Sequence, residues 1–106
     1  MYKMFQTAHA FNSDISGWDV SKVTNMGAMF AGTYAFNSDI SGWDVSKVIM
    51  MSTMFHGARA FNQDLSQWCV GNFTTQPIYF DTVIETSSWV LPRPVWGTCP
   101  RGENMT

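Results

Sequence analysis

One segment, Ala10-Phe11-Asn12-Ser13-Asp14-Ile15-Ser16-Gly17-Trp18-Asp19-Val20, occurs again unchanged as residues 35–45, and an edited copy occupies residues 60–70. Each copy begins 25 residues after the one before it, with no insertion. A gap-free period of this length is typical of repeat proteins in which every repeat forms one coil that stacks on the next. We therefore expect residues that are 25 positions apart to be neighbours in space.

Each period contains two kinds of apolar pattern. Apolar and polar side chains alternate across 18–20, which is typical of a short strand with one buried face. Met26, Met29 and Phe30 follow the i, i+3, i+4 spacing of one face of a short helix, and Gly32 stands where a helix commonly ends in a left-handed residue. The sequence thus predicts an α/β solenoid of 25-residue coils, each with a short parallel β-strand and a short helix.

The regular repeats end before the chain does. Residues 1–73 hold three copies in register, the first of them incomplete, and residues 74–106 read as a degraded final coil and a C-terminal cap within one domain. Tyr79-Phe80 still stands in register with Met29-Phe30, whereas the apolar tail at 89–96 is interrupted by proline. Because proline blocks further strand pairing, this tail is suited to covering the last coil.

The first copy has no recognisable N-terminal cap. Met4-Phe5 aligns with Met29-Phe30, so the chain starts in the middle of a coil and reads as a processed or incomplete chain. An open end of a repeat array exposes apolar side chains and unpaired backbone, which natural repeat proteins avoid. We expect this end to be covered by more chain or by another subunit.

Composition and motifs argue against several classes of function. Charged residues make up 13% of the chain and the net charge is −2, so we expect neither nucleic acid nor an anionic membrane as a partner. No apolar run approaches the roughly 20 residues of a transmembrane helix. The chain has no zinc-protease, phosphate-loop or nucleophile-elbow motif, and His9 and His56 belong to no repeated constellation. We therefore expect a non-enzymatic protein without a cofactor or a metal.

Polar side chains also recur with the period. We expect the asparagine row to bond to the backbone of neighbouring coils and the first aspartate row to serve turns. The asparagines are Asn12, Asn37 and Asn62, and the aspartates are Asp14, Asp39 and Asp64.

A second aspartate row marks the outer face of the expected strands. Asp19 and Asp44 stand one period apart, with Ser21 and Ser46 two residues after them. Adjacent strands would hold the carboxylates about 4.8 Å apart, a repulsion that solvent, the neighbouring lysines, a protein partner or a bound cation could relieve. Calcium takes six to eight oxygens and this narrow strip offers few. We retain Asp19, Ser21, Asp44 and Ser46 as candidate partner-contact residues.

The stretch Phe11–Phe30 resembles a known bacterial repeat. It reads Phe-Asn-x-Asp-Ile-Ser-x-Trp-Asp-Val-Ser-x-Val-Thr-Asn-Met-x-x-Met-Phe, which is similar to the repeat of BspA-like bacterial surface proteins and mycoplasma lipoproteins. The likeness covers Met4 to about Val70, and Pro94–Pro100 resembles the C-terminal ending of that family. Ile49-Met50 departs from it by replacing the Thr-Asn pair of the first repeat. The resemblance implies a leucine-rich-repeat-like solenoid in a surface-exposed, adhesive or scaffolding protein, with no catalytic residues.

The two cysteines, Cys69 and Cys99, lie outside the regular pattern. Cys69 replaces the aspartate on the outer face of the expected strand, where a cap that crosses this end could bring Cys99 to it. Their position in a tail that resembles a cap favours a disulfide, which would stabilise the fold by roughly 3–4 kcal/mol and imply an oxidising compartment. Two free thiols, or part of a metal site, are the alternatives.

Two tripeptides are N-glycosylation sequons. They are Asn72-Phe73-Thr74 and Asn104-Met105-Thr106, and neither has proline in the middle. Occupancy requires a eukaryotic secretory route, so Asn72 and Asn104 are candidate sites only for such a source.

These observations favour an extracellular, cell-surface or lumenal module that binds proteins through its sheet face and its exposed end, within a longer chain. The first alternative is a structural subunit held inside a larger assembly, including a membrane-associated one, with its open N-terminal end covered by a partner. A calcium-dependent module is the second alternative.

Overall fold

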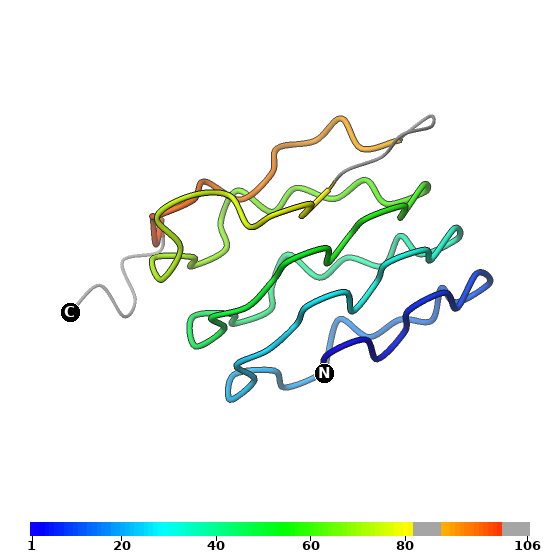
Figure 1. The fold of residues 1–106 in the computed structure, drawn as a ribbon, viewed down its shortest axis with the longest axis horizontal. Coiled ribbons are helices and arrows are strands. Elements are labelled where there is room, and N and C mark those ends of the chain that lie inside the picture. Colours follow the sequence, from blue (N-terminus) through cyan, green and yellow to red (C-terminus); the bar gives the residue numbers. More distant parts are fainter. Residues whose placement is uncertain (82–87, 101–106) are drawn as a thin grey trace.

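Successive repeats lie one above another in the computed structural model, which describes residues 1–81 and 88–100 (Figure 1). We call residues 1–25 coil 1, residues 26–50 coil 2 and residues 51–75 coil 3, and each coil is a flattened loop that runs out and back. The N–H of Asn37 donates to Oδ1 of Asn12 at 2.8 Å, and the N–H of Asn62 donates to Oδ1 of Asn37 at 2.7 Å. Residues one period apart are therefore neighbours, and the predicted asparagine row is present.

The secondary structure differs from the prediction. Residues 1–81 and 88–100 contain no α-helix and no β-strand, and the isolated parallel bridge described among them pairs Asn25 with Met50. The chain is a compact globule of tight turns and short links, 39 × 25 × 20 Å across. The prediction of a leucine-rich-repeat-like α/β solenoid, with a strand and a helix in every coil, is wrong.

A run of tight turns replaces the helix predicted after Met26. Ala28 and Gly32 have φ values of +54° and +72°, outside the right-handed helical region. The N–H of Met29 closes a turn on the carbonyl of Met26 at 3.3 Å, whereas the N–H groups of Ala28 and Phe30 donate to carbonyls of coil 3 at 2.9 Å. Backbone donors that a helix would use internally therefore join one coil to the next.

The strand predicted around Trp18 is confined between two turns. The N–H of Trp18 bonds to the carbonyl of Ile15 at 3.1 Å, and the N–H of Val23 bonds to the carbonyl of Val20 at 3.0 Å. The alternation of burial is nevertheless present, because across 43–45 the outer two side chains are buried and the middle one is exposed. The sequence pattern identified the inward-facing residues correctly and the backbone wrongly.

Aromatic side chains one period apart form continuous rows through the core. Phe11, Phe36 and Phe61 stack with 5.6 and 5.7 Å between successive ring centroids. Phe30 stacks on Phe36 of its own coil at 4.1 Å and on Phe55 of the next coil at 5.5 Å. Because both sides of each coil contribute rings, the rows hold the coil together and also attach it to its neighbours.

Two buried tryptophans join each coil to the one before it. Nε1 of Trp43 donates to the carbonyl of Ile15 at 3.2 Å, and Nε1 of Trp68 donates to the carbonyl of Ile40 at 3.0 Å. A buried indole N–H needs an acceptor, so these bonds also fix the register of the stack.

The stacked rows end at the C-terminal side on edge-on rings. Phe80 meets Phe55 at an interplanar angle of 77°, and Trp89 meets Phe61 at 89°. Phe80 fills the core position that the repeat predicted, but the N–H of Phe55 bonds to the carbonyl of Phe80 itself. In the preceding coils the equivalent acceptor is one residue earlier, as in the bond from Phe30 to Met54. The pairing is therefore displaced by one residue where the regular array ends.

Candidate interaction surfaces

The predicted partner-contact residues lie on the surface as a row of aspartate-capped turns. Oδ1 of Asp19 accepts from the N–H and the hydroxyl of Ser21 at 3.0 and 2.6 Å, and Asp44 accepts from Ser46 at the same distances. The Asp-x-Ser spacing that produces these turns is visible in the sequence, yet the sequence reasoning missed it. Both carboxylates are exposed. Contact between this row and a protein partner stays a prediction.

The first aspartate row serves turns, as predicted. Oδ1 of Asp39 accepts from the N–H and the hydroxyl of Ser41 at 3.0 and 2.7 Å, and Asp14 is paired with Ser16 in the same way. The hydroxyl hydrogen bond, with help from the backbone one, lowers the pKa of both carboxyls below their usual 3.8. This shift moves them away from the pKa range that general acid–base catalysis uses.

The histidines and acidic residues do not gather into a metal site in the described ranges. Among residues 1–81 and 88–100, no group of three His, Cys, Asp or Glu side chains lies close enough to hold an ion. His9 stacks on Tyr34 with 4.2 Å between ring centroids, and Arg59 covers Tyr34 at 4.2 Å. Nδ1 of His56 is buried and has no hydrogen-bond partner in that part of the chain. A single imidazole does not supply the ligand set of a metal centre.

Asn72, the first candidate glycosylation site, makes structural hydrogen bonds. Its Nδ2 donates to the carbonyls of Ser46 at 2.8 Å and Val48 at 3.4 Å. A glycan on this nitrogen would replace one of its two protons, so only one of the two bonds could remain. Occupancy of Asn72 stays a prediction, and Asn104 lies outside the described residues.

A disulfide between Cys69 and Cys99 fastens the C-terminal cap, as predicted. Both residues are buried, and their Cα atoms are 4.0 Å apart. Beside the bridge, the N–H of Val70 donates to the carbonyl of Thr98 at 2.8 Å. A disulfide is compatible with an oxidising, extracellular setting.

The cap also reproduces the contacts of a repeat coil. Oδ1 of Asn62 accepts from the N–H groups of Val90 and Leu91 at 3.0 Å, where earlier asparagines accept from the next asparagine. Nε1 of Trp89 donates back to the carbonyl of Gln63 at 2.9 Å, as the repeat tryptophans do to earlier carbonyls. The C-terminal end of the stack is therefore closed by groups that imitate one more coil.

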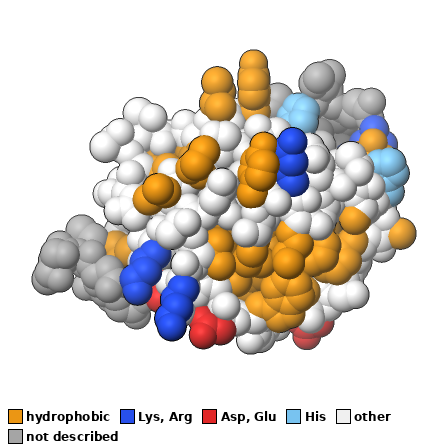
Figure 2. Space-filling view, turned by 60° about the horizontal axis from the view of Figure 1, so that its bottom comes forward, with side chains coloured by type: hydrophobic (Ala, Val, Ile, Leu, Met, Phe, Trp, Pro, Cys, Tyr) orange, Lys and Arg blue, Asp and Glu red, His pale blue; other side chains and the backbone are white. Residues whose placement is uncertain are grey.

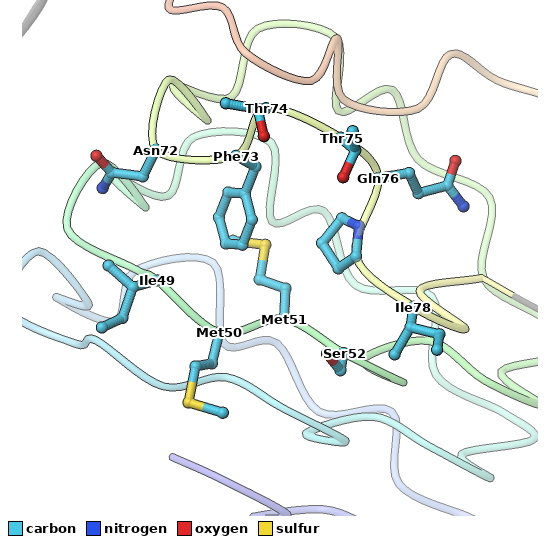
Figure 3. A pocket seen from close by; sticks show the side chains of 11 residues that line it. Ile49, Met50, Met51, Ser52, Asn72, Phe73, Thr74, Thr75, Gln76 and Ile78 are labelled. Atoms are coloured by element: carbon cyan, nitrogen blue, oxygen red, sulfur yellow. The ribbon is translucent and has the colours of Figure 1, made fainter.

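A shallow groove of about 520 Å³ lies between 49–52 and 72–78 (Figure 3). Phe73 and Met51 lie side by side within it, and Ile49 is 63% exposed at its edge. None of the described residues that line the groove is ionisable, so they offer contact area without a charge to select a ligand. It arises where Ile49-Met50 replaces the polar pair Thr24-Asn25 of the first repeat.

The opposite, N-terminal end of the stack exposes the aromatic rows. Figure 2 shows an apolar patch on this side of the molecule, with lysine and aspartate side chains along one edge. Phe5 and Phe11 stack on each other at 3.9 Å and are only half-buried, whereas their equivalents in coil 2 are fully buried. Trp18 is 40% exposed beside Phe5, in contrast to 2% for Trp43. We call this surface, formed by Phe5, Phe11, Trp18 and the exposed side chains of Tyr2 and Met4, the N-terminal face.

The sequence predicted an open end but did not show how it is built. The alignment of Met4-Phe5 with Met29-Phe30 indicated that the rows would be uncovered there. It gave no sign that the backbone of 1–8 would form successive turns, because Lys3 and Thr7 carry no local signal for their φ values of +58° and +60°.

Comparison with known proteins places the chain in a family. No curated protein and no solved structure matches it. Within the described residues no helix is long and apolar enough to cross a bilayer. The family described as "Mycoplasma protein of unknown function, DUF285" matches residues 1–89, which contain all the regular repeats. The chain belongs to this family.

Proposed function

We propose that the chain is a non-enzymatic protein-interaction module of an extracellular or cell-surface protein, related to the BspA-like surface proteins whose repeat it resembles. The observation that carries the proposal is the exposure of aromatic residues on the N-terminal face. The sides of the stack also expose apolar side chains, including Ile49 and Ile78, whereas the N-terminal face adds a partly exposed tryptophan to two stacked, half-buried phenylalanines.

The composition of the N-terminal face supports a role in binding. Protein interfaces are enriched in tryptophan, tyrosine, phenylalanine and methionine at their centre and are depleted there of charge. Trp18 and Phe11 both contact Phe5 on this face, and Met4, the residue before Phe5, is 51% exposed. An exposed apolar patch of this kind is costly in water unless a partner covers it.

The disulfide supports the proposed location. Stable disulfides persist in oxidising compartments, and the bridge between Cys69 and Cys99 closes the end of the stack away from the N-terminal face. The interaction module would therefore be held rigid at one end and be open at the other.

A structural subunit in a larger assembly is the second candidate, and the same face favours it. In that case a foreign subunit would cover Trp18 and Phe11 permanently. The two candidates differ in whether reagents outside the cell reach the protein. Amine reagents that cannot cross membranes would label a surface module at Lys22 and Lys47, which are exposed on the side of the stack.

Site-specific photo-crosslinking in the cells that make the protein tests the proposal. A photoreactive phenylalanine analogue replaces Trp18 in one variant and Val90, which is 80% exposed at the capped end, in the control. We expect a discrete protein adduct from position 18 and none from position 90, together with labelling of Lys22 and Lys47 on intact cells. Equal crosslinking from both positions would contradict a binding role for the N-terminal face, and protection of the lysines in intact cells would favour the internal subunit.

A further inference from the structure

Backbone hydrogen bonds between coils run in one direction on one side of the stack. This side, which we call the turn side, comprises 1–8 of coil 1, 26–33 of coil 2 and 51–58 of coil 3. The N–H groups of Lys3, Phe5 and Thr7 donate at 2.8–2.9 Å to carbonyls of Gly27, Met29 and Ala31. Ala28, Phe30 and Gly32 donate in the same way to Ser52, Met54 and His56. On this side, each coil thus donates hydrogen bonds to the next coil and accepts them from the one before.

Coil 1 has the acceptors for this series without the donors. The carbonyls that correspond to Gly27, Met29 and Ala31 belong to Tyr2, Met4 and Gln6. In residues 1–81 and 88–100 no backbone N–H reaches these three oxygens, and Gln6 accepts only from the adjacent hydroxyl of Thr7. By the register of the stack these three carbonyl oxygens face outward, so the N-terminal face carries a row of hydrogen-bond acceptors beside its aromatic rings.

The other side of coil 1, residues 9–25, has open donors where the turn side has open acceptors. Trp43 and Trp68 donate from Nε1 to a carbonyl of the preceding coil, and Asn37 and Asn62 donate their N–H to the preceding asparagine. The equivalent donors in coil 1 are Nε1 of Trp18 and the N–H of Asn12. Within the described part of the chain neither has an acceptor.

We propose that the N-terminal face binds one further coil of the same 25-residue repeat, entering in the same direction as coils 1 to 3. The inference rests on the proposed function and names the class of partner. Such a coil presents N–H groups over Tyr2, Met4 and Gln6, and a carbonyl and an asparagine Oδ1 over Trp18 and Asn12. The surface is continuous with the interfaces between coils 1 and 2 and between coils 2 and 3, and it repeats their donor and acceptor pattern.

A second copy of this chain does not satisfy the same groups. When two N-terminal faces are brought together, the two donors of one copy, Trp18 and Asn12, meet three carbonyls of the other, so at least one buried acceptor lacks a donor. The other end of a second copy is closed by the disulfide-fastened cap, whose Trp89 and Val90 already occupy the groups of coil 3. The occupant is therefore a coil of the repeat with a free donor side.

Addition of a coil in cis tests the proposal directly. A second copy of residues 26–50 is placed before Met1, so that its junction repeats the natural sequence from Met50 to Met51. Hydroxyl-radical footprinting then compares the oxidation of Trp18 and Met4 in the extended and the 106-residue chains. Because Trp18 is 40% exposed and Trp43 2%, we expect Trp18 oxidation to fall about twentyfold, to the level of Trp43.

Two controls make the result decisive. The first carries the same extension with its 25 residues in scrambled order, for which we expect Trp18 and Met4 to stay as reactive as in the 106-residue chain. Protection of Trp43 in every variant verifies that the stack itself is folded. Unchanged reactivity of Trp18 in the extended chain, with Trp43 protected, would overturn the proposal.

Sedimentation of the 106-residue chain distinguishes the second-copy alternative. A concentration-dependent dimer in which Trp18 becomes protected would overturn the assignment of the occupant, whereas a chain whose Trp18 stays reactive as concentration rises agrees with it. These outcomes are independent of the crosslinking experiment. A foreign protein crosslinked at position 18 would support the proposed function even if the added coil did not bind to the N-terminal face.

Discussion

Trp43 shows how a single side chain holds two coils together. It is 2% exposed, its ring lies 6.2 Å from that of Phe30, and its indole N–H bonds to the carbonyl of Ile15. The repeat identified this burial correctly, since the alternation across 43–45 places the tryptophan inward. The hydrogen bond could not be read from the sequence, because it depends on which carbonyl the stacking brings within reach.

We expect Trp43→Ala to lower the free energy of unfolding by about 3–5 kcal/mol, as for other large-to-small changes in a core. The change also removes one of the two hydrogen bonds that the carbonyl of Ile15 accepts, and the bond from the N–H of Trp18 remains. Urea unfolding followed by circular dichroism measures the loss, and Trp18→Ala is the matched control at the equivalent, half-open position. Equal losses in the two variants would show that the coils are packed alike, contrary to the structure.

The aspartate turns make stability depend on pH. Hydrogen bonds from Ser41 lower the pKa of Asp39 from 3.8, so the carboxyl is more acidic in the folded than in the unfolded chain. Its stabilising contribution is fully present above the unfolded pKa of 3.8 and is lost as the pH falls through the lower, folded pKa. The same sign applies to Asp14, Asp19 and Asp64.

We expect the urea midpoint to be constant near neutral pH and to decrease as the pH falls below 3.8. Asp39→Asn keeps an oxygen that accepts from Ser41 but does not titrate, so its midpoint should decrease less over the same range. Ser41→Ala, which removes the hydroxyl bond, should also reduce the pH dependence. A midpoint that rises on acidification would contradict the assigned direction of the pKa shifts.

At the scale of the element, consecutive turns take the place of a helix. Met26, Met29 and Phe30 have helical spacing, and they are buried together as a helix would bury them. The same spacing also suits a run of turns, so periodicity alone could not separate the two. The deciding residue is Ala28, which adopts a left-handed φ of +54° although alanine disfavours it. Contacts between coils impose that conformation, and a single repeat contains no local sign of it.

Coil 3 offers a matched pair for testing the cost of these turns. Thr53 and Gly57 have φ values of +65° and +73°. We expect Thr53→Gly to stabilise the fold by about 0.5–1 kcal/mol, because a β-branched residue is strained there and glycine is not. We expect Gly57→Ala to destabilise it by about 1–2 kcal/mol. A Cβ added at Gly57 meets no atom closer than 3.6 Å, so this cost is conformational rather than steric.

Thermal unfolding of the two variants gives the sign of each effect. Loss of stability in Thr53→Gly would show that contacts of the threonine side chain outweigh its backbone strain. A neutral Gly57→Ala variant would show that the turn side relaxes without the left-handed residue.

At the scale of the whole molecule, the two ends of the stack differ. The C-terminal end is closed by edge-on rings, a disulfide and imitated repeat contacts, whereas the N-terminal end leaves its rows open. The period predicted which residues meet and where regularity stops, as the fit of Phe80 into the core illustrates. It could not predict the one-residue displacement at Phe80 or the backbone of the coils, because both are settled by contacts between repeats rather than within them.

This asymmetry predicts a gradient of local stability. The N–H of Phe5 and that of Phe30 both donate across coils at 2.9 Å, but coil 1 is covered on one side only. In a stack where each unit depends on its neighbours, the end unit opens more often. We expect the amide of Phe30 to exchange with solvent much more slowly than that of Phe5 when hydrogen exchange is followed by NMR. Equal exchange rates would indicate that the whole stack opens as one unit.

The one-way hydrogen bonding of the turn side also gives that side of the stack an electrical polarity. Peptide dipoles that point the same way add together, as they do along an α-helix. Here the N–H groups of Phe5 and Phe30 point toward the C-terminal cap, so the partial positive pole lies at the cap and the partial negative pole at coil 1. This is the reverse of a helix, whose N-terminus is positive. The N–H groups of Asn37 and Asn62, on the other side of the stack, point the opposite way. The polarity therefore belongs to the turn side, whose first coil favours cations and whose capped end favours anions.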